Sequence, residues 1–171
     1  EIPIQEALSG PESAQWMEAI EKEVKALLGH TMLLVDSQHP ERAQAEATAT
    51  GSRFVLTKKR CGRHKARWVV QGFSEPRELD DISNHSHVAR LESLRLITFK
   101  RGRRGRVLAS VDVKTAFLQS EKYAQHEPAR YIKYWDPISR QWIYFRLLGP
   151  MYGQRSAPIR WENTLFPWLI S

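Results

Sequence analysis

The sequence has a single cysteine, no long apolar run and no low-complexity tract. With Cys61 alone, an internal disulfide and a cysteine-based zinc site are both excluded. No stretch approaches the roughly 18 apolar residues that a membrane-spanning helix needs, so we expect no membrane partner. The scarcity of cysteine favours an intracellular location. Because residue 1 is Glu rather than an initiator methionine, a removed targeting segment, and with it an organellar location, stays open.

What the sequence does contain is apolar and aromatic side chains in the proportion of a folded protein. Hydrophobic residues make up 42% of the 171 positions, with six Trp, six Phe and five Tyr. This content argues against intrinsic disorder. The length suits one domain with one core, so we treat residues 1–171 as a single domain.

Positive charge is in excess, with a formal net charge of +7, and it is clustered. A solvated basic face is the simpler interpretation of either cluster alone. Two such clusters in one small domain favour a polyanionic partner, RNA above all. The predicted nucleic-acid-binding residues are Arg53, Lys58, Lys59, Arg60, Arg63, Lys65 and Arg67 in the first cluster, and Lys100, Arg101, Arg103, Arg104 and Arg106 in the second.

Apolar periodicity predicts an N-terminal packing helix over residues 11–28. Pro11 suits the first helical position and Gly29 the position after the end. Its inward face is formed by apolar residues at spacings of three and four, which are Trp16, Ile20, Val24 and Leu27.

The remaining pattern predicts an α+β fold. We expect a short strand at 31–35, a loop or weak helix at 38–50, and a surface loop at 74–86. β-Branched and aromatic runs at 53–59 and 66–73 flank a basic tip and predict a hairpin. A second hairpin is expected from 131–134 and 142–147, turning near Asp136. A buried strand is predicted at 107–113, and helices at 91–99 and 157–168.

Five blocks, in order along the chain, resemble one family. They are Trp16, Ala19 and Glu23 on the first helix, 53–59 (RFVLTKK), 65–73 (KARWVVQGF), 91–96 with 112–118 (DVKTAFL), and 147–161 with Tyr152-Gly153 and Ala157-Pro158. Together they resemble the N-terminal half of a copia-type retrotransposon reverse transcriptase over nearly the whole chain. The resemblance implies a fingers hairpin at 53–73 and a partial palm sheet at 91–171, with 11–28 as the packing helix.

The resemblance also implies roles for single residues. Asp112 matches the first catalytic carboxylate, which helps to hold magnesium. Phe117 matches the aromatic residue that lies against the incoming sugar and selects against a 2′-hydroxyl. Lys65 and Arg67 match cations that meet the triphosphate, a contact suited to a guanidinium. The alternatives stay open: Phe117 as a core residue, Asp112 in a cap or ion pair, and the two cations as ordinary edge-strand charges.

The family's second metal-binding motif, Tyr, a variable residue and two aspartates, is not found. The adjacent pair Asp80-Asp81 precedes Asp112 and cannot replace it. Since two magnesium ions need several converging carboxylates, we expect Asp112 to be vestigial. Magnesium is then a cofactor only if the missing motif is supplied elsewhere. His85 and His87 lack a trustworthy metal-ligand spacing, so we predict no metal site.

At three further positions the sequence departs from the family. Met32 stands where the family has Trp, Gln154 where it has Leu, and His87 where it has Pro. These departures are what relaxed constraint on catalysis would leave.

Three functional hypotheses follow. The favoured one is a truncated, domesticated and non-catalytic reverse transcriptase remnant, which serves as an RNA-binding or structural component of a large ribonucleoprotein such as a ribosome. Other proteins would then cover its exposed palm face. The second is the N-terminal fragment of an active copia-type RNA-directed DNA polymerase whose remaining palm is on another segment or chain. The third is a protein-binding adaptor.

Overall fold

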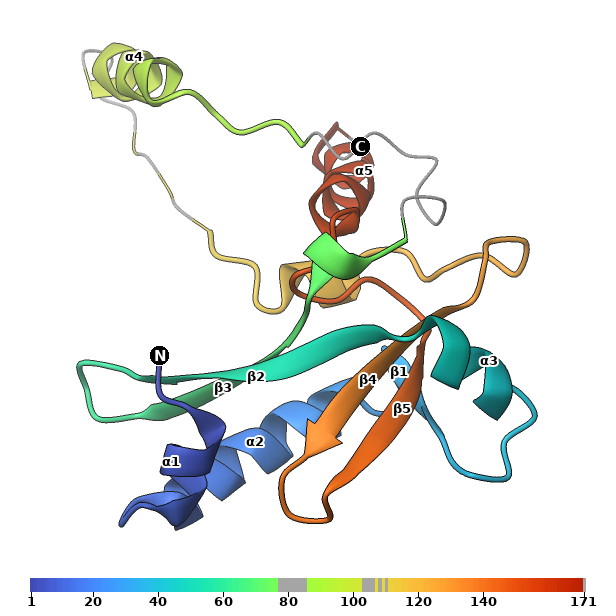
Figure 1. Cartoon of the computed structure of the whole chain (residues 1–171). Helices are drawn as coiled ribbons and strands as arrows, with labels where there is room; N and C mark the ends of the chain where they lie inside the picture. The colour runs from blue at the N-terminus through green and yellow to red at the C-terminus, as the bar shows by residue number, and fades with distance from the viewer. Residues whose placement is uncertain (77–85, 103–106, 108, 110, 171) are drawn as a thin grey trace.

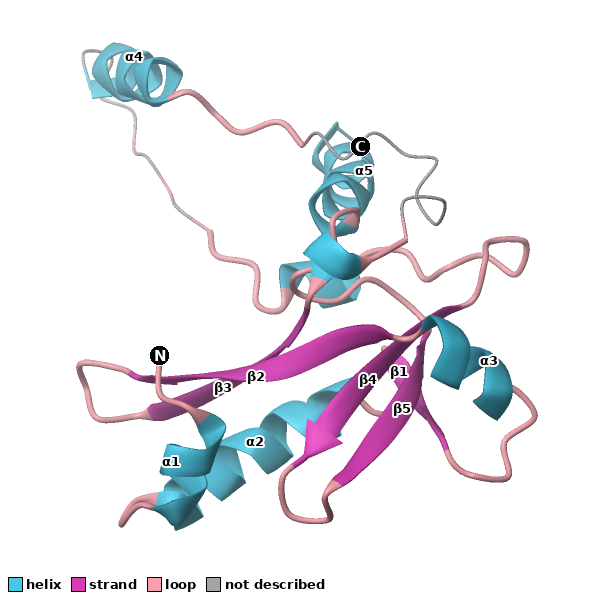
Figure 2. Cartoon of the chain, viewed as in Figure 1, coloured by secondary structure: helices cyan, strands magenta, loops and turns pink. Residues whose placement is uncertain are grey.

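The structure is a computed structural model that describes residues 1–76, 86–102, 107, 109 and 111–170, a mixed α+β unit (Figures 1 and 2). The predicted residues Arg103, Arg104 and Arg106, the pair Asp80-Asp81 and His85 lie outside these ranges. In chain order the elements are α1 (Ile4–Ser9), α2 (Ser13–Leu27), β1 (Met32–Val35), α3 (Arg42–Thr48), β2 (Thr50–Lys58), β3 (His64–Val70), η1 (Gly72–Ser74), α4 (Leu91–Gly102), η3 (Ala116–Gln119), β4 (Arg130–Asp136), β5 (Gln141–Leu147) and α5 (Ala157–Ile170).

One five-stranded sheet, in the order β1-β5-β4-β2-β3, organises the described residues. The hairpins β2–β3 and β4–β5 are antiparallel, as predicted, and only β2 and β4 pair in parallel. The turn of the second hairpin is set by Asp136, whose carboxylate accepts hydrogen bonds from the backbone N–H groups of Ile138 and Ser139. An Asp side chain at this position accepts hydrogen bonds from N–H groups of the turn in place of a backbone carbonyl oxygen.

Helix α2 confirms the predicted packing face. Trp16 and Leu27 are buried, and Ile20 and Val24 pack against the same core under the sheet. The helix begins at Ser13 rather than Pro11, which lies in the preceding turn. Gly29 follows the helix with a φ of +77°, a left-handed conformation that glycine adopts without steric cost. The helix therefore ends close to the position that the sequence predicts.

The predicted buried strand at 107–113 is wrong for its described residues. Val107 and Val111 are 95% and 86% exposed, and neither is in a strand. β-Branched residues favour extended backbone, but a strand is stable only beside another strand that accepts its hydrogen bonds. In the described sheet the edges are β1 and β3, and no described residue of 107–113 pairs with either.

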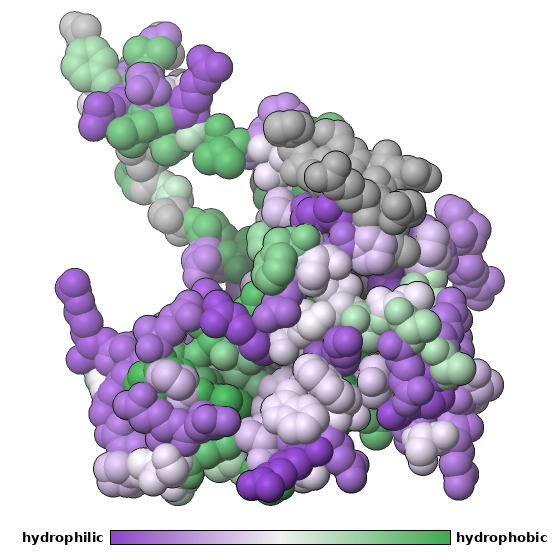
Figure 3. All heavy atoms as spheres, viewed as in Figure 1, coloured by the Kyte–Doolittle hydropathy of each residue, from purple (hydrophilic) through white to green (hydrophobic). Residues whose placement is uncertain are grey.

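Helix α4 forms where predicted but does not pack as a palm helix. All of its side chains are exposed, including Leu94, Ile97 and Phe99. Figure 1 shows α4 standing away from the sheet, and Figure 3 shows apolar and hydrophilic surface mixed on it. Among the helices that the structure describes, none is long and apolar enough to cross a membrane.

Two glycines let the end of β3 approach the loop before α5. A Cβ atom on Gly72 would lie 2.1 Å from the carbonyl oxygen of Gly153, and one on Gly153 would lie 2.1 Å from that of Val70. Such distances are far inside van der Waals contact. The two segments can therefore meet only as bare backbone.

We predict that Gly72→Ala lowers the free energy of unfolding by about 1–3 kcal/mol, because the added methyl group must displace backbone atoms. Urea unfolding followed by circular dichroism measures this change. Gly102→Ala is the matched control, since a Cβ there meets nothing within 4 Å. A Gly72→Ala protein as stable as the parent would show that the close approach is absent.

Candidate functional site

The loop before α5 meets the end of β3 through one backbone hydrogen bond. The N–H of Val70 donates to the carbonyl oxygen of Tyr152 over 2.8 Å. This bond and the two glycines fix the position of Tyr152. Its ring then lies between two residues that the sequence singles out separately.

Tyr152 joins Arg67 of β3 to Phe117 of η3. The Arg67 guanidinium carbon lies 5.8 Å from the centre of the Tyr152 ring, within the range of a cation–π contact. The Phe117 and Tyr152 ring centres are 5.7 Å apart, with their planes inclined by 57°. We call Arg67, Tyr152 and Phe117 the aromatic corner. The aromatic corner links the cation that is predicted to meet the triphosphate to the residue that is predicted to contact the sugar.

Phe117 lies in a short turn that is closed by hydrogen bonds between its own residues. Thr115 adopts a φ of +52° before η3, and its carbonyl oxygen accepts the Leu118 N–H. The Gln119 amide donates to the carbonyl oxygen of Lys114 over 2.6 Å. Phe117 is half-buried rather than in the core, so one part of its ring is open to a ligand.

Charges around the corner are only partly balanced. Glu23 of α2 accepts the backbone N–H of Trp68, and burial raises the pKa of its carboxyl group. Burial lowers the pKa of Lys65, and the neighbouring Arg67 lowers it further. Burial also raises the pKa of Tyr152, with a further increase from the charge of Glu23. The carboxylate of Glu23 thus lies near two cations, Lys65 and Arg67. This excess of positive charge favours the binding of an anion.

Asp112 does not form a metal centre with the other described residues. It is exposed in the segment that leads to η3. No group of three or more His, Cys, Asp and Glu side chains that could hold a metal occurs in ranges 1–76, 86–102 and 111–170. Magnesium ions prefer several oxygen ligands in an octahedral arrangement. These residues therefore do not fit the pair of magnesium ions that the resemblance implies.

The first basic cluster divides into paired and unpaired cations. Arg53 lies 3.5 Å from a Glu1 carboxylate oxygen, and Lys58 pairs with Glu12 of α2. Tip residues without a carboxylate partner in the described chain are Lys59, Arg60 and Arg63, all exposed. From the second cluster, Lys100 and Arg101 are exposed at the end of α4. RNA binding by either cluster stays a prediction.

A buried polar network behind the corner has no clear signal in the sequence. The Gln154 amide donates to Glu75 over 2.8 Å and accepts from the Tyr123 hydroxyl over 3.0 Å. Glu75, only 6% exposed, also accepts the Arg155 N–H. The pKa of Tyr123 is raised to about 12, mainly by burial. Gln154 and Glu75 are 79 positions apart, so only the fold brings them together.

The three departures from the family pattern all make defined contacts. Met32 is fully buried in the core, and Gln154 is at the centre of the polar network. The backbone N–H of His87 donates to a Glu162 carboxylate oxygen over 2.7 Å. Met32 is thus part of the core, and the Gln154 amide and the His87 N–H are both hydrogen-bonded in the described fold.

Comparisons with known proteins identify the family of the chain. The family model "Reverse transcriptase (RNA-dependent DNA polymerase)" matches residues 38–171. The chain therefore belongs to this reverse transcriptase family. Within the family it is a copia-type reverse transcriptase fragment, since its relatives are Pol polyproteins of such transposons. No solved structure matches the chain.

Among those relatives, the Retrovirus-related Pol polyprotein from transposon RE2 of Arabidopsis thaliana is 29% identical over 96% of this chain and 11% of its own length. That from transposon TNT 1-94 of Nicotiana tabacum is 28% identical over 92% of this chain and 12% of its own length. The Truncated transposon Ty1-A Gag-Pol polyprotein of Saccharomyces cerevisiae is 26% identical over 93% of this chain and 13% of its own length. The chain thus spans about a tenth of the length of these relatives.

The comparisons reverse the order of the functional hypotheses. They support the polymerase-fragment hypothesis better than the favoured ribonucleoprotein hypothesis, for which they hold no evidence. The preference for a ribosomal or RNA-binding component rested on the basic clusters and on the missing aspartate pair. Both features are compatible with one segment of a polymerase.

We predict that Gln154→Leu, which places the family's residue in this fold, costs about 1–3 kcal/mol of stability. The change removes the hydrogen-bond partner of the Tyr123 hydroxyl and of one Glu75 carboxylate oxygen in a buried site. A double-mutant cycle with Glu75→Leu, measured by urea unfolding, checks the origin of the loss. A coupling energy of about 1 kcal/mol or more is expected. Additive losses would contradict the network.

Proposed function

We propose that this chain supplies the fingers and part of the palm of a copia-type RNA-directed DNA polymerase, and that the aromatic corner binds the incoming nucleotide. The observation that carries the proposal is the contact of the Tyr152 ring with both Arg67 and Phe117. It joins a cation for phosphate to an aromatic surface for sugar and base. The family membership supports the polymerase assignment.

Each part of the corner suits one part of a nucleotide. Arg67 is exposed on β3, and its planar guanidinium can bind phosphate oxygens through two parallel hydrogen bonds. Lys65, two residues earlier on the same face of the strand, adds a second positive charge. The rings of Tyr152 and Phe117 offer apolar surface against the sugar. A ring that fills the space beside the 2′ carbon excludes a hydroxyl there by contact.

The polymerase chemistry needs more than these residues. Phosphoryl transfer relies on metal ions that neutralise charge on the attacking and leaving oxygens. By resemblance, Asp112 is the one carboxylate of this chain that matches a ligand of these metal ions. Because the described residues do not converge on a metal, we assign this chain nucleotide binding and orientation, and no catalytic step.

Nucleotide binding by the chain is directly testable. Equilibrium dialysis of labelled dTTP, in buffer with magnesium, should show that Arg67→Gln weakens binding roughly tenfold or more, because a charge-assisted hydrogen bond contributes about 1.5–3 kcal/mol. Phe117→Ala should reduce the preference for dTTP over its ribonucleotide. Arg95→Gln, an exposed Arg on α4, is the matched control.

Two results would remove the nucleotide assignment. One is equal affinity for dTTP in the parent, Arg67→Gln and Arg95→Gln proteins. The other is a preference for the deoxynucleotide that Phe117→Ala leaves unchanged. Either result would return the aromatic corner to a purely structural role.

A further prediction concerns catalysis. With magnesium, a primer–template and all four nucleotides, the 171-residue chain should extend no primer, and Asp112→Asn should not alter that assay. A lone aspartate cannot supply the ligands that two metal ions require. Primer extension on a sequencing gel measures the outcome. Extension that disappears in Asp112→Asn would show that the chain assembles a metal centre.

A further inference from the structure

Strand β3 lies at one edge of the described sheet, and two of its backbone N–H groups point away from β2. The N–H of Trp68 donates to a Glu23 carboxylate oxygen over 3.2 Å, and the N–H of Val70 donates to the carbonyl oxygen of Tyr152 over 2.8 Å. In an antiparallel strand, the N–H groups of residues two apart point to the same edge. Glu23 and Tyr152 therefore occupy neighbouring positions along one edge, and Glu23 holds the residue that follows Arg67.

Glu23 is carried by α2, a helix that is fixed by the core. Trp16 and Leu27 of this helix are buried, and Val24, the residue next to Glu23, packs against the same core. A functional group on a packed helix is positioned more precisely than one on a loop. The helix thus gives the carboxylate a defined place beside β3.

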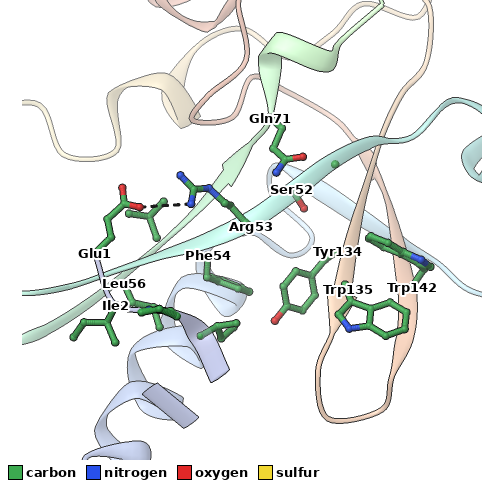
Figure 4. A pocket seen from close by; sticks show the side chains of 14 residues that line it. Glu1, Ile2, Ser52, Arg53, Phe54, Leu56, Gln71, Tyr134, Trp135 and Trp142 are labelled. Atoms are coloured by element: carbon green, nitrogen blue, oxygen red, sulfur yellow. Dashed lines mark ion pairs between the residues drawn. The ribbon is translucent and has the colours of Figure 1, made fainter. Parts of the chain in front are cut away.

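The two cations near Glu23 differ from other cations of the first basic cluster. Arg53 of β2 lies 3.5 Å from a Glu1 carboxylate oxygen, at the pocket drawn in Figure 4. Within the described ranges, no ion pair joins Lys65 or Arg67 to a carboxylate. Their charges nevertheless act on Glu23, because they oppose the rise that burial causes in the pKa of its carboxyl group. By the same interaction, the charge of Glu23 lowers the positive potential that a phosphate group meets at Arg67.

We propose that Glu23 is a positioning residue of the nucleotide site, which holds Arg67 in place through the backbone of Trp68 and whose negative charge limits the affinity of the site for a triphosphate. The inference rests on the proposed function, since it concerns the regulation of the same site. Protonation of Glu23 separates the two effects. A neutral carboxyl group still has an oxygen that accepts the Trp68 N–H, but it no longer repels an anion.

Nucleotide affinity should therefore depend on pH. Burial is the main cause that raises the pKa of Glu23, so its carboxyl group takes up a proton above the ordinary range of a glutamate. Above that pKa the carboxylate repels the triphosphate, and below it the repulsion is absent. The groups that face it, Lys65 and Arg67 of β3 and the Tyr152 hydroxyl, do not change their charge in acid.

A purely structural role is the competing explanation for Glu23. Strand edges are often covered by neighbouring elements, and here a side chain of α2 covers one N–H of β3. Under that explanation, an amide at position 23 would replace the carboxylate without an effect on nucleotide affinity, because an amide oxygen accepts the same N–H. The charge of Glu23 is thus the property that separates the two explanations.

Equilibrium dialysis of labelled dTTP with magnesium, between about pH 4.5 and about pH 8, tests the role of the charge. At the upper end, Glu23→Gln should bind dTTP roughly two- to fivefold more tightly than the parent, the range expected for partly exposed charges. The ratio should approach one toward the lower end, where the parent carboxyl group is protonated. Titration of the triphosphate itself cancels in this ratio. Glu18→Gln, which removes an exposed carboxylate of α2, should bind like the parent at every pH.

Glu23→Asp tests the positioning role. It keeps the charge but shortens the side chain by one methylene, so it should lose the Trp68 contact and bind dTTP at least roughly twofold more weakly than the parent, about the smallest effect of losing one hydrogen bond. The amide proton of Trp68, observed by nuclear magnetic resonance, should follow the titration of Glu23 in the parent and not in Glu23→Gln. This second measurement needs no nucleotide, and it decides the Trp68 contact even if Glu23→Asp folds poorly.

This inference and the proposed function fail in different ways. If dTTP binds through Arg67 but the ratio between Glu23→Gln and the parent stays at one over the whole pH range, Glu23 has only a structural role and the nucleotide site stands. A Trp68 amide proton that does not respond to the titration would overturn the positioning contact. If the parent binds no dTTP, the proposed function fails, and the inference fails with it.

Discussion

The hydrogen bond from the Val70 N–H to the Tyr152 carbonyl oxygen is the contact on which the functional part of the structure depends. It is possible because Gly72 and Gly153 carry no side chain where the two backbones touch. On one side of this contact, Tyr152 is held against Arg67 and Phe117. On the other side, Gln154 is carried to the buried carboxylate of Glu75. A change in this one approach would thus alter both the aromatic corner and the network that supports it.

The sequence predicts local structure well where a short pattern is sufficient. Four apolar residues at helical spacing identify the buried face of α2, and β-branched runs around basic or Asp-containing turns identify both hairpins. Arg67 and Phe117 could be named from family motifs. Tyr152 could be placed in a motif but not given a role, because its role comes from the packing of a loop against β3. Glu75 and Gln154 could not be paired, since they are far apart in the sequence.

The errors have a common physical origin. Residues 107–113 have the composition of a strand, and α4 has several apolar side chains, yet their described residues are exposed. Composition indicates which backbone conformation a segment prefers, but not which other segment will cover it. A strand and an apolar helix are both stabilised mainly by such partners. The order of the functional hypotheses failed for a related reason, because clustered charge indicates the sign of a partner and not its identity.

The parallel seam between β2 and β4 connects the second hairpin to the strand of the aromatic corner. The two hairpins share three backbone residue pairs and the Ser52 hydroxyl, which donates to the carbonyl oxygen of Lys133 and accepts from the Trp68 indole. The Trp68 ring also packs against the rings of Tyr134 and Phe145 across the seam. Trp68 directly follows Arg67 on β3, so the side chain that spans the seam belongs to the same stretch of strand as the cation of the aromatic corner. The Ser52 hydroxyl therefore ties the β4 backbone to the strand that carries Arg67.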